Sequence, residues 1–128
     1  MRILFDSHAL IWFLDNNPRL SQTARKALLD PEAVLTVSAV SAWELANKVR
    51  LGKWPAIARF AERFVETIEE LGYKILPISA EHAQLAGLMH GAHRDPFDRM
   101  LAAQSQIENM PLVTADPVFK AFGTKVIW

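Results

Sequence analysis

The chain has 128 residues, of which 51% are hydrophobic, and its 14 basic and 14 acidic residues give a formal net charge of zero. This size and composition predict a single domain over residues 1–128 with a substantial apolar core, and they exclude a disordered tail. Zero net charge also excludes nucleic-acid binding through bulk charge, so any such partner must be recognised by a local patch.

No membrane partner is expected, because the longest apolar runs, Ala9–Leu14 and Val34–Val37, are far too short to cross a bilayer. The N-terminal apolar run ends in Asp6 and lacks the length and cleavage site of a secretory signal. The chain contains no cysteine, which excludes disulfides and thiolate metal sites and fits a reducing, cytoplasmic location.

In the first half of the chain, short β-type runs alternate with longer helical patterns. Ser21 is a suitable N-cap for one helix, and either Ser38 or Ser41 for the next. The predicted elements are a strand over Ile3–Phe5, a helix containing Ala9–Leu14, a turn over Asp15–Pro18, a helix from Ser21 to Leu29, a strand over Val34–Val37 and a helix ending near Gly52.

The second half continues the alternation. Apolar residues recur at helical spacing throughout Ala56–Leu71, which predicts one amphipathic helix that ends at Gly72. The remaining predicted elements are a strand over Lys74–Ile78, a helix from Ser79, a helix opened by Asp95-Pro96, a strand over Leu112–Thr114, a short helix over Pro117–Phe122 and a strand over Val126–Trp128.

Strands that alternate with helices indicate an α/β fold with a parallel or mostly parallel sheet covered on both faces. In such sheets ligands bind beyond the carboxyl ends of the strands. Four acids fall at that edge: Asp6 directly after the first strand, Glu44 in the first turns of a helix, Asp98 in the first turn of another, and Asp116 after the fourth strand.

Each acid also has a purely structural interpretation. Asp6 and Asp116 are suitable helix caps, and Asp95 with Asp98 resembles a capping box. Glu44 and Lys48 form a favourable i, i+4 pair.

The combination favours a metal site. Four like charges at one sheet edge raise one another's pKa and destabilise the fold unless a cation neutralises them. Carboxylate oxygens suit Mg²⁺ or Mn²⁺, and such an ion activates water for attack at phosphorus.

Four segments of the chain resemble the PIN-domain family, in particular its VapC-type toxin ribonucleases. They are Ile3-Leu4-Phe5-Asp6-Ser7-His8-Ala9-Leu10-Ile11-Trp12, Ser38-Ala39-Val40-Ser41-Ala42-Trp43-Glu44-Leu45, His93-Arg94-Asp95-Pro96-Phe97-Asp98-Arg99-Met100-Leu101-Ala102-Ala103-Gln104 and Leu112-Val113-Thr114-Ala115-Asp116. The third is the most specific, and the four occur in the family's order over nearly the whole chain.

This resemblance implies a three-layer α/β/α sandwich whose metal, Mg²⁺ or Mn²⁺, is held by Asp6, Glu44, Asp98 and Asp116. It implies endonucleolytic cleavage of RNA that leaves a 5′-phosphate and a 3′-hydroxyl. Asp98, rather than Asp95, corresponds to the family's third acid, because it precedes the apolar Met100–Ala103 stretch. A homodimer is implied too, with a VapB-type antitoxin whose tail covers the groove and inserts a basic side chain among the carboxylates.

Several other polar residues are candidates for supporting roles. Ser7, Asp95 and Thr114 are candidates for orienting carboxylates or water, although each also suits a backbone cap. Arg94 and Arg99 flank the site and are candidates for phosphate contacts, with a pairing inside the helix as the alternative for Arg99.

Packing or surface roles are expected for His8 and His93, and core or interface roles for Trp12, Trp43 and Trp54. The run of positive charges at Lys48, Arg50, Lys53 and Arg59 is either a local patch for nucleic acid or a solvated helix end.

Two other functions fit parts of this pattern. An aspartyl-phosphate phosphatase needs a second acid two residues after the first, and His8 stands there. A non-catalytic PIN-like module that binds only RNA or protein is the remaining alternative, although all four acids are present.

Overall fold

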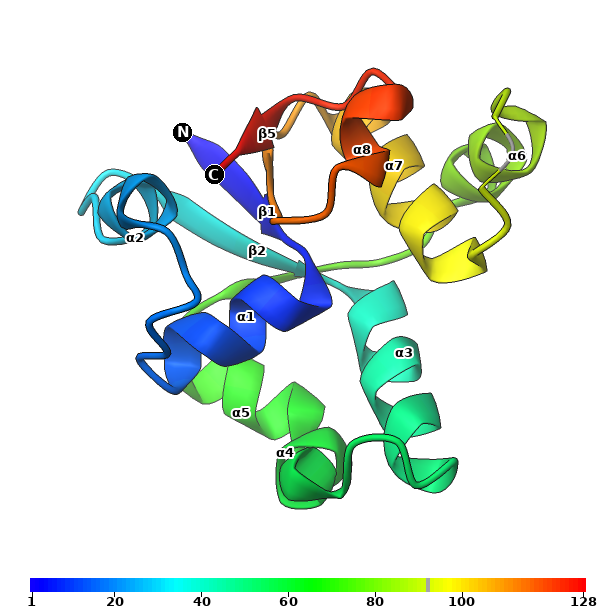
Figure 1. Cartoon of the computed structure of the whole chain (residues 1–128). Coiled ribbons are helices and arrows are strands. Elements are labelled where there is room, and N and C mark those ends of the chain that lie inside the picture. Colours follow the sequence, from blue (N-terminus) through cyan, green and yellow to red (C-terminus); the bar gives the residue numbers. More distant parts are fainter. Residues whose placement is uncertain (92) are drawn as a thin grey trace.

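The computed structural model describes residues 1–91 and 93–128 and is built on a five-stranded sheet in the order β3-β2-β1-β4-β5, in which every pairing is parallel (Figure 1). Leu4 of the central strand lies opposite Thr36 on one side and Leu112 on the other. The strands are β1 (Arg2–Phe5), β2 (Val34–Ser38), β3 (Lys74–Leu76), β4 (Leu112–Val113) and β5 (Val126–Ile127).

Helices cover both faces of the sheet, as the α/β prediction requires. They are α1 (Ser7–Leu14), α2 (Gln22–Leu28), α3 (Ala39–Arg50), the 3₁₀ turn η1 (Pro55–Ile57), α4 (Ala58–Glu62), α5 (Phe64–Glu70), α6 (Ala80–Leu88), α7 (Pro96–Glu108) and α8 (Val118–Ala121). Within the described residues, the structure contains no helix with the length and hydropathy needed to span a membrane.

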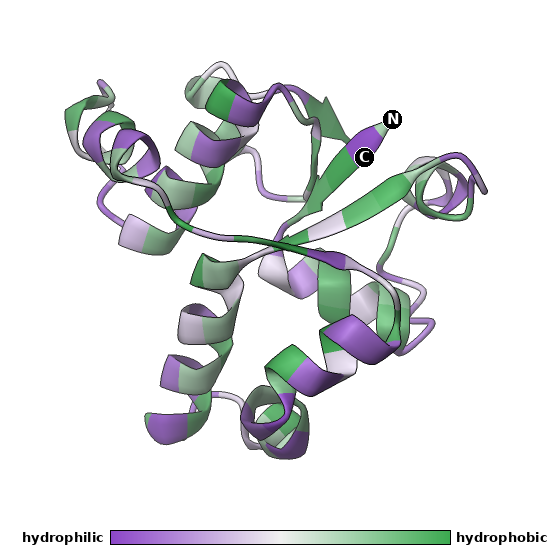
Figure 2. Ribbon diagram, turned by 180° about the vertical axis from the view of Figure 1, so that it is seen from behind, coloured by the Kyte–Doolittle hydropathy of each residue, from purple (hydrophilic) through white to green (hydrophobic). Residues whose placement is uncertain are grey.

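The side chains of β1 alternate between two apolar clusters, because successive residues of a strand point to opposite faces. Ile3 and Phe5 pack with α1, α2 and α5 on one face. Leu4 packs with α7 and α8 on the other. Both faces of β1 are therefore buried, in agreement with its purely apolar Ile3–Phe5 sequence, and the strands stand out as apolar in Figure 2.

The order of the strands creates a switch point next to β1. The chain runs outward from β1 to β2 and β3, then crosses the sheet to β4 and β5 on the other side of β1. Right-handed crossovers put helices on opposite faces when the direction of progress reverses, which accounts for the two clusters. The carboxyl ends of β1 and β4 lie side by side at this point, where open α/β sheets bind ligands.

The predicted helix starts are confirmed. The side chains of Ser21, Ser38, Ser79 and Asp95 each accept hydrogen bonds from backbone amides in the first turn of the following helix. Ser38, rather than Ser41, is the cap of α3. Ser79 forms a full capping box in which His82 takes the reciprocal bond.

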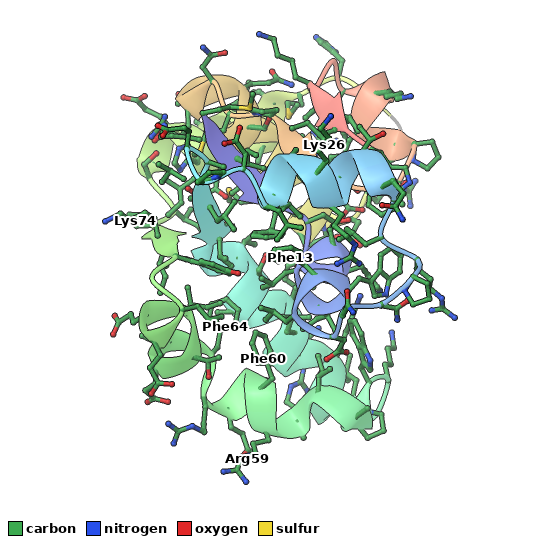
Figure 3. All side chains as sticks on the ribbon, turned by 90° about the vertical axis from the view of Figure 1, so that its left-hand side faces the viewer. Phe13, Lys26, Arg59, Phe60, Phe64 and Lys74 are labelled. Atoms are coloured by element: carbon green, nitrogen blue, oxygen red, sulfur yellow. The ribbon has the colours of Figure 1, made fainter. Side chains whose placement is uncertain are left out.

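The prediction of one helix over Ala56–Leu71 is wrong. The segment divides into η1, α4 and α5, with a break at Arg63, where φ is −108° and ψ is 25°. Packing explains the break: α4 contacts α3, whereas α5 contacts β3. A straight helix cannot meet both, so Phe60 and Phe64 instead form an edge-to-face ring pair across the break (Figure 3).

A buried amide joins β2, α6 and α7. Gln104 is fully buried; its oxygen accepts a hydrogen bond from the Ser38 hydroxyl, and its nitrogen lies 3.4 Å from both the Pro77 carbonyl and His82 Nδ1. Without Gln104 the buried Ser38 hydroxyl would lack its acceptor, which would lower the stability of the fold. The amide therefore holds α6 and α7 against the end of β2.

Replacing Gln104 with Leu should lower the free energy of unfolding by about 1–3 kcal/mol, because the Ser38 hydroxyl loses its acceptor. The measurement is the urea midpoint at unchanged m-value. Gln84→Leu is the matched control, since Gln84 is exposed on α6 and its loss should change stability by about 0.5 kcal/mol or less. Equal midpoints for the two variants would show that the buried amide does not stabilise the fold.

Candidate active site

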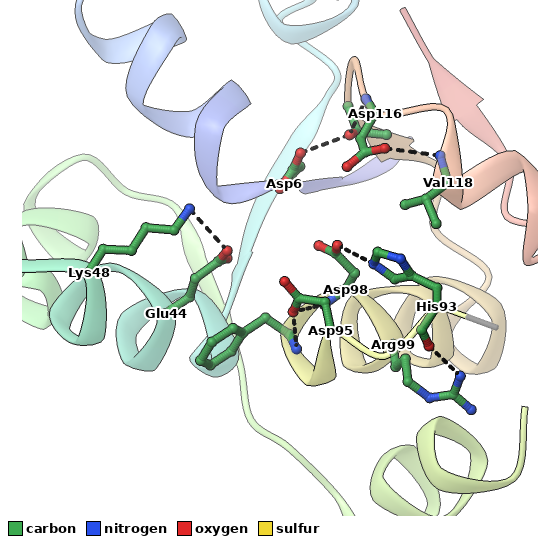
Figure 4. A network of polar contacts seen from close by, with 11 residues as sticks. Asp6, Glu44, Lys48, His93, Asp95, Asp98, Arg99, Asp116 and Val118 are labelled. Carbon is green, nitrogen blue, oxygen red and sulfur yellow. Dashed lines mark hydrogen bonds and ion pairs between the residues drawn. The ribbon is translucent and has the colours of Figure 1, made fainter. Parts of the chain in front are cut away.

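The switch point gathers four acids from distant parts of the chain. Asp6 follows β1, Glu44 lies on α3, Asp98 lies in the first turn of α7 and Asp116 follows β4. Figure 4 shows their carboxylates turned toward a common space between these elements. The expected convergence at the carboxyl edge of the sheet is thus present in the fold.

Asp6 is buried, with 8% of its surface exposed. Its side chain makes no cap bond to α1; instead the Thr114 hydroxyl donates to Asp6 Oδ2 at 2.8 Å. Burial raises the pKa of Asp6 to about 7, the Thr114 hydrogen bond lowers it, and the charges of Glu44 and Asp98 raise it. The fold therefore holds this carboxyl where its charged form is destabilised.

Glu44 is also buried and is contacted by two side chains, those of Ser7 and Lys48. Ser7 Oγ donates to Glu44 Oε1 at 2.6 Å, and Lys48 Nζ lies 3.5 Å from Oε2. Ser7 Oγ also lies 3.0 Å from Ser41 Oγ, one turn before Glu44 on α3. The predicted i, i+4 pair is present, and Ser41, expected only as a cap, is part of the support for Glu44.

Asp98 does not complete a capping box. Asp95 Oδ1 accepts from the amides of Phe97 and Asp98, but Asp98 Oδ2 lies 2.8 Å from His93 Nε2. Burial raises the pKa of Asp98 to about 6; the His93 hydrogen bond opposes this, and the charges of Asp95 and Glu44 add to it.

Ligand atoms of His93, Asp95 and Asp98 lie within 4.8 Å of one another. Among the described residues, this is the one set of three metal-binding side chains so close together. Asp6, Glu44 and Asp116 face the same space but stand farther apart.

Asp116 is exposed and serves as a local cap. Its Oδ1 accepts from the Val118 amide at 3.0 Å, and its own amide donates to Thr114 Oγ1 at 3.1 Å. The same threonine hydroxyl therefore connects Asp6 and Asp116. The predicted positions of Ser7 and Thr114 beside acids agree with these contacts.

Arg99 is held by the end of α6 and by the loop that follows it. Its guanidinium donates to the carbonyls of Ala86, Met89 and His93 and lies over the ring of Phe122. These contacts favour a structural role over the predicted phosphate contact, and they fix the backbone of His93. Arg94 is exposed and stays a candidate for phosphate binding.

The expected packing role suits His8, which stacks on Trp54 with 4.9 Å between ring centroids. Burial lowers the pKa of His8, and the nearby charge of Lys48 lowers it further. Trp12 and Trp54 are half-buried. Trp43 is 60% exposed, so it is not a core residue, and its ring forms a T-shaped pair with that of Phe97.

Sequence reasoning underestimated His93. It lies two residues before the cap of α7, and the predicted packing or surface role did not include contact with Asp98. The signal that could have revealed this contact was the position of His93, two residues before the N-cap Asp95. That spacing lets the chain turn back so that the histidine reaches the first turn of the helix. Arg99, one residue after Asp98, makes that turn rigid.

The donor set fits a hard divalent cation. Asp6 and Asp98 both have pKa values raised by burial and by neighbouring acids, which is the condition that a bound cation relieves. Their oxygens, with those of Glu44 and Asp116, are the ligands that Mg²⁺ and Mn²⁺ prefer, and His93 could add a nitrogen.

Comparisons with known proteins agree with the fold. A profile of the PIN domain matches residues 3–125. No curated protein matches the sequence. Twenty-eight chains in solved structures match.

VapBC2 from Rickettsia felis bound to a promoter DNA fragment is 18% identical, with a TM-score of 0.71 over 98% of this chain and 97% of that one. FitAcB from Neisseria gonorrhoeae is 24% identical, with a TM-score of 0.69 over 100% and 97% of the two chains. DNA-bound VapBC from Salmonella typhimurium is 19% identical, with a TM-score of 0.68 over 98% and 96%. At these identities the likeness concerns the fold.

In chelator, the stability of the protein should fall as the pH rises from about 4 to about 7. The folded-state pKa of Asp6 is raised, so the folded protein binds a proton that the unfolded chain has lost, and this advantage disappears as the pH passes about 7. The full effect is on the order of 4 kcal/mol. The measurement is the free energy of unfolding of wild type minus that of Asp6→Asn at each pH. Because both proteins contain His8, the subtraction cancels its pH dependence, which has the opposite sign. A difference that is independent of pH would contradict the raised pKa.

Thr114→Val should weaken Mn²⁺ binding by about 10-fold or more, because Asp6 loses the hydrogen bond that orients it and favours its charged form. Thr114→Ser keeps the hydroxyl and should bind like wild type. Isothermal titration with Mn²⁺ at neutral pH measures both. Equal weakening by Val and Ser would assign the effect to packing at Thr114 instead of the hydroxyl.

Proposed function

The chain belongs to the PIN domain family, and on this basis we propose that it is a metal-dependent endoribonuclease and the toxin of a type II toxin–antitoxin pair. The observation that carries the proposal is the set of four acids at the switch point, Asp6, Glu44, Asp98 and Asp116. Burial and the charges of neighbouring acids raise the pKa values of Asp6 and Asp98. Repulsion among these acids lowers the stability of the folded protein, and a bound cation offsets that loss.

In the proposed reaction, these four residues hold Mg²⁺ or Mn²⁺. When bound, the ion lowers the pKa of a water and neutralises phosphate charge. Water adds to phosphorus, the bond from phosphorus to the 3′-oxygen breaks, and the products carry a 5′-phosphate and a 3′-hydroxyl.

The protein's other residues orient the acids. Ser7 holds Glu44 through Oε1, and Thr114 holds Asp6. Asp95 caps α7 and so fixes the backbone from which Asp98 projects. Lys48 neutralises part of the charge of Glu44, which lowers the repulsion that an approaching phosphate meets.

A partner antitoxin is part of the proposal. One similar structure is described as a toxin–antitoxin complex from Klebsiella pneumoniae, and the VapBC neighbours share the fold. A VapB-type antitoxin that inserts a basic side chain among these carboxylates would replace the cation electrostatically. A homodimer is proposed with it, by analogy with the family.

The test is cleavage of total cellular RNA by antitoxin-free protein in Mg²⁺, Mn²⁺ or chelator. Wild type should release discrete 5′-phosphorylated fragments that need metal, and Asp98→Asn should lower the rate by more than about 100-fold, since a ligand is lost rather than its support. Asp30→Asn is the matched control and should cleave like wild type, because it removes an exposed acid from the connection between α2 and β2.

A thermal-shift measurement separates the nuclease from the non-catalytic module. Mg²⁺ or Mn²⁺ should raise the unfolding temperature of wild type but not of Asp98→Asn, because only the folded site binds the ion. Equal shifts for both proteins would contradict the metal site. A shift without cleavage of any RNA would favour the binding-only module.

A further inference from the structure

A hollow of about 410 Å³ lies beside the carboxylates, on the side of α1 and α3. We call it the basic pocket; it is lined by His8, Trp12, Arg19, Lys48, Lys53 and Trp54. Three of these residues are cations, and none of the described residues that line it is acidic. On a chain of zero net charge, such a local excess of positive charge requires an explanation.

Two of the three cations are available to a ligand. Arg19 and Lys53 are exposed, and within the described chain their side chains have no hydrogen bond or ion pair. Arg19 uses only its backbone amide, which donates to Asn17 Oδ1 at 2.9 Å. Lys48, by contrast, is paired with Glu44. The pocket thus presents two uncompensated positive charges.

The walls of the pocket are aromatic and mutually supported. His8 stacks on Trp54, and Trp12 tilts against His8 at 5.9 Å and against Trp128 at 6.0 Å. Lys48 Nζ lies 5.8 Å from the centre of a Trp54 ring. Cations beside aromatic rings are the combination that binds single-stranded nucleic acid, with charges for the backbone and rings for the bases.

The pocket is connected to the acids through two residues. His8 is the second residue of α1, directly after Ser7 and two residues after Asp6. Lys48 contacts both Glu44 and the Trp54 ring. A strand with one phosphate at the carboxylates would therefore pass directly into the pocket. Lys48 and Lys53 of the positive run both line the basic pocket, and Arg19 from the turn before α2 lies beside them there.

We propose that the basic pocket binds the phosphate of a nucleotide next to the cleaved bond, with Arg19 and Lys53 as its charge partners. The inference rests on the proposed function and defines the path of the substrate strand on one side of the cut. Single-stranded RNA is favoured over an acidic peptide because the aromatic walls suit bases and because the neighbouring acids repel carboxylates but bind phosphate through metal.

The test is binding of a short, fluorescein-labelled, single-stranded RNA in EDTA, followed by anisotropy over a range of salt. The double variant Arg19→Gln/Lys53→Gln should bind about 10-fold or more weakly, and the slope of log affinity against log salt should fall by about 0.7–1.4, as expected for one or two lost phosphate contacts. Lys74→Gln/Lys125→Gln removes the same charge from exposed residues outside the pocket and should bind like wild type.

A neutral methylphosphonate placed at successive linkages of the RNA locates the contact. One linkage should weaken binding to wild type and have no further effect on the Arg19→Gln/Lys53→Gln variant. The conservative variant Arg19→Lys/Lys53→Arg should recover the wild-type response, and matching unfolding temperatures for all variants show that the fold is unchanged.

The possible outcomes are distinct. Unchanged RNA binding by the double variant, with metal-dependent cleavage intact in wild type, would overturn the pocket inference and leave the nuclease proposal standing. Wild type that neither binds nor cleaves RNA would overturn both. Loss of binding to an acidic peptide, without loss of RNA binding, would assign the pocket to a protein partner and overturn its role toward RNA.

Discussion

The burial of one carboxyl, that of Asp6, at the end of the central strand is the constraint on which the rest of the site depends. Both faces of β1 are covered by helices, so the residue after Phe5 enters an environment that disfavours charge. Glu44 and Asp98 then add repulsion from α3 and α7. The Thr114 hydroxyl lowers part of this cost at Asp6 without removing it, and Lys48 pairs with Glu44.

The topology explains why these groups meet. Asp6 and Asp116 follow neighbouring strands because the chain crosses β1 to place β4 beside it, and the two crossovers place α3 and α7 on either side of the same gap. The supporting contacts come from the same geometry. Ser7 begins α1, so its hydroxyl reaches α3, while Arg99 begins α7 and its guanidinium reaches the end of α6. The site is thus a property of the switch point, rather than of any one segment.

Much of the fold was predictable from local chemistry. Apolar runs gave the strands, and Ser21, Ser79 and Asp95 marked helix starts because their side chains satisfy free amides. The four acids were predictable because each follows such a boundary. The break at Arg63 was not, since the spacing of apolar residues suits a straight helix and only the positions of α3 and β3 require two.

The contacts that join distant segments were equally beyond sequence reasoning. His93 meets Asp98 because Arg99 binds carbonyls at the end of α6 and in the loop that follows it, contacts that no sequence periodicity indicates. Arg19 and Lys53 are separated by more than a helix and a strand, and nothing in either neighbourhood links them. By contrast, the predicted support of acids by Ser7 and Thr114 agrees with the structure because strand ends leave little freedom in where a short side chain lies.

The parallel pairing of β1 with β4 also has a consequence during synthesis. Asp6 leaves the ribosome well before Thr114 and Asp116, which lie beside it in the fold but more than 100 residues later in the sequence. A nascent chain that stops short of β4 contains three of the four acids but lacks Asp116 and the strand that positions it beside Asp6. Any activity that needs all four must therefore wait until Asp116 has been synthesised and β4 has paired with β1.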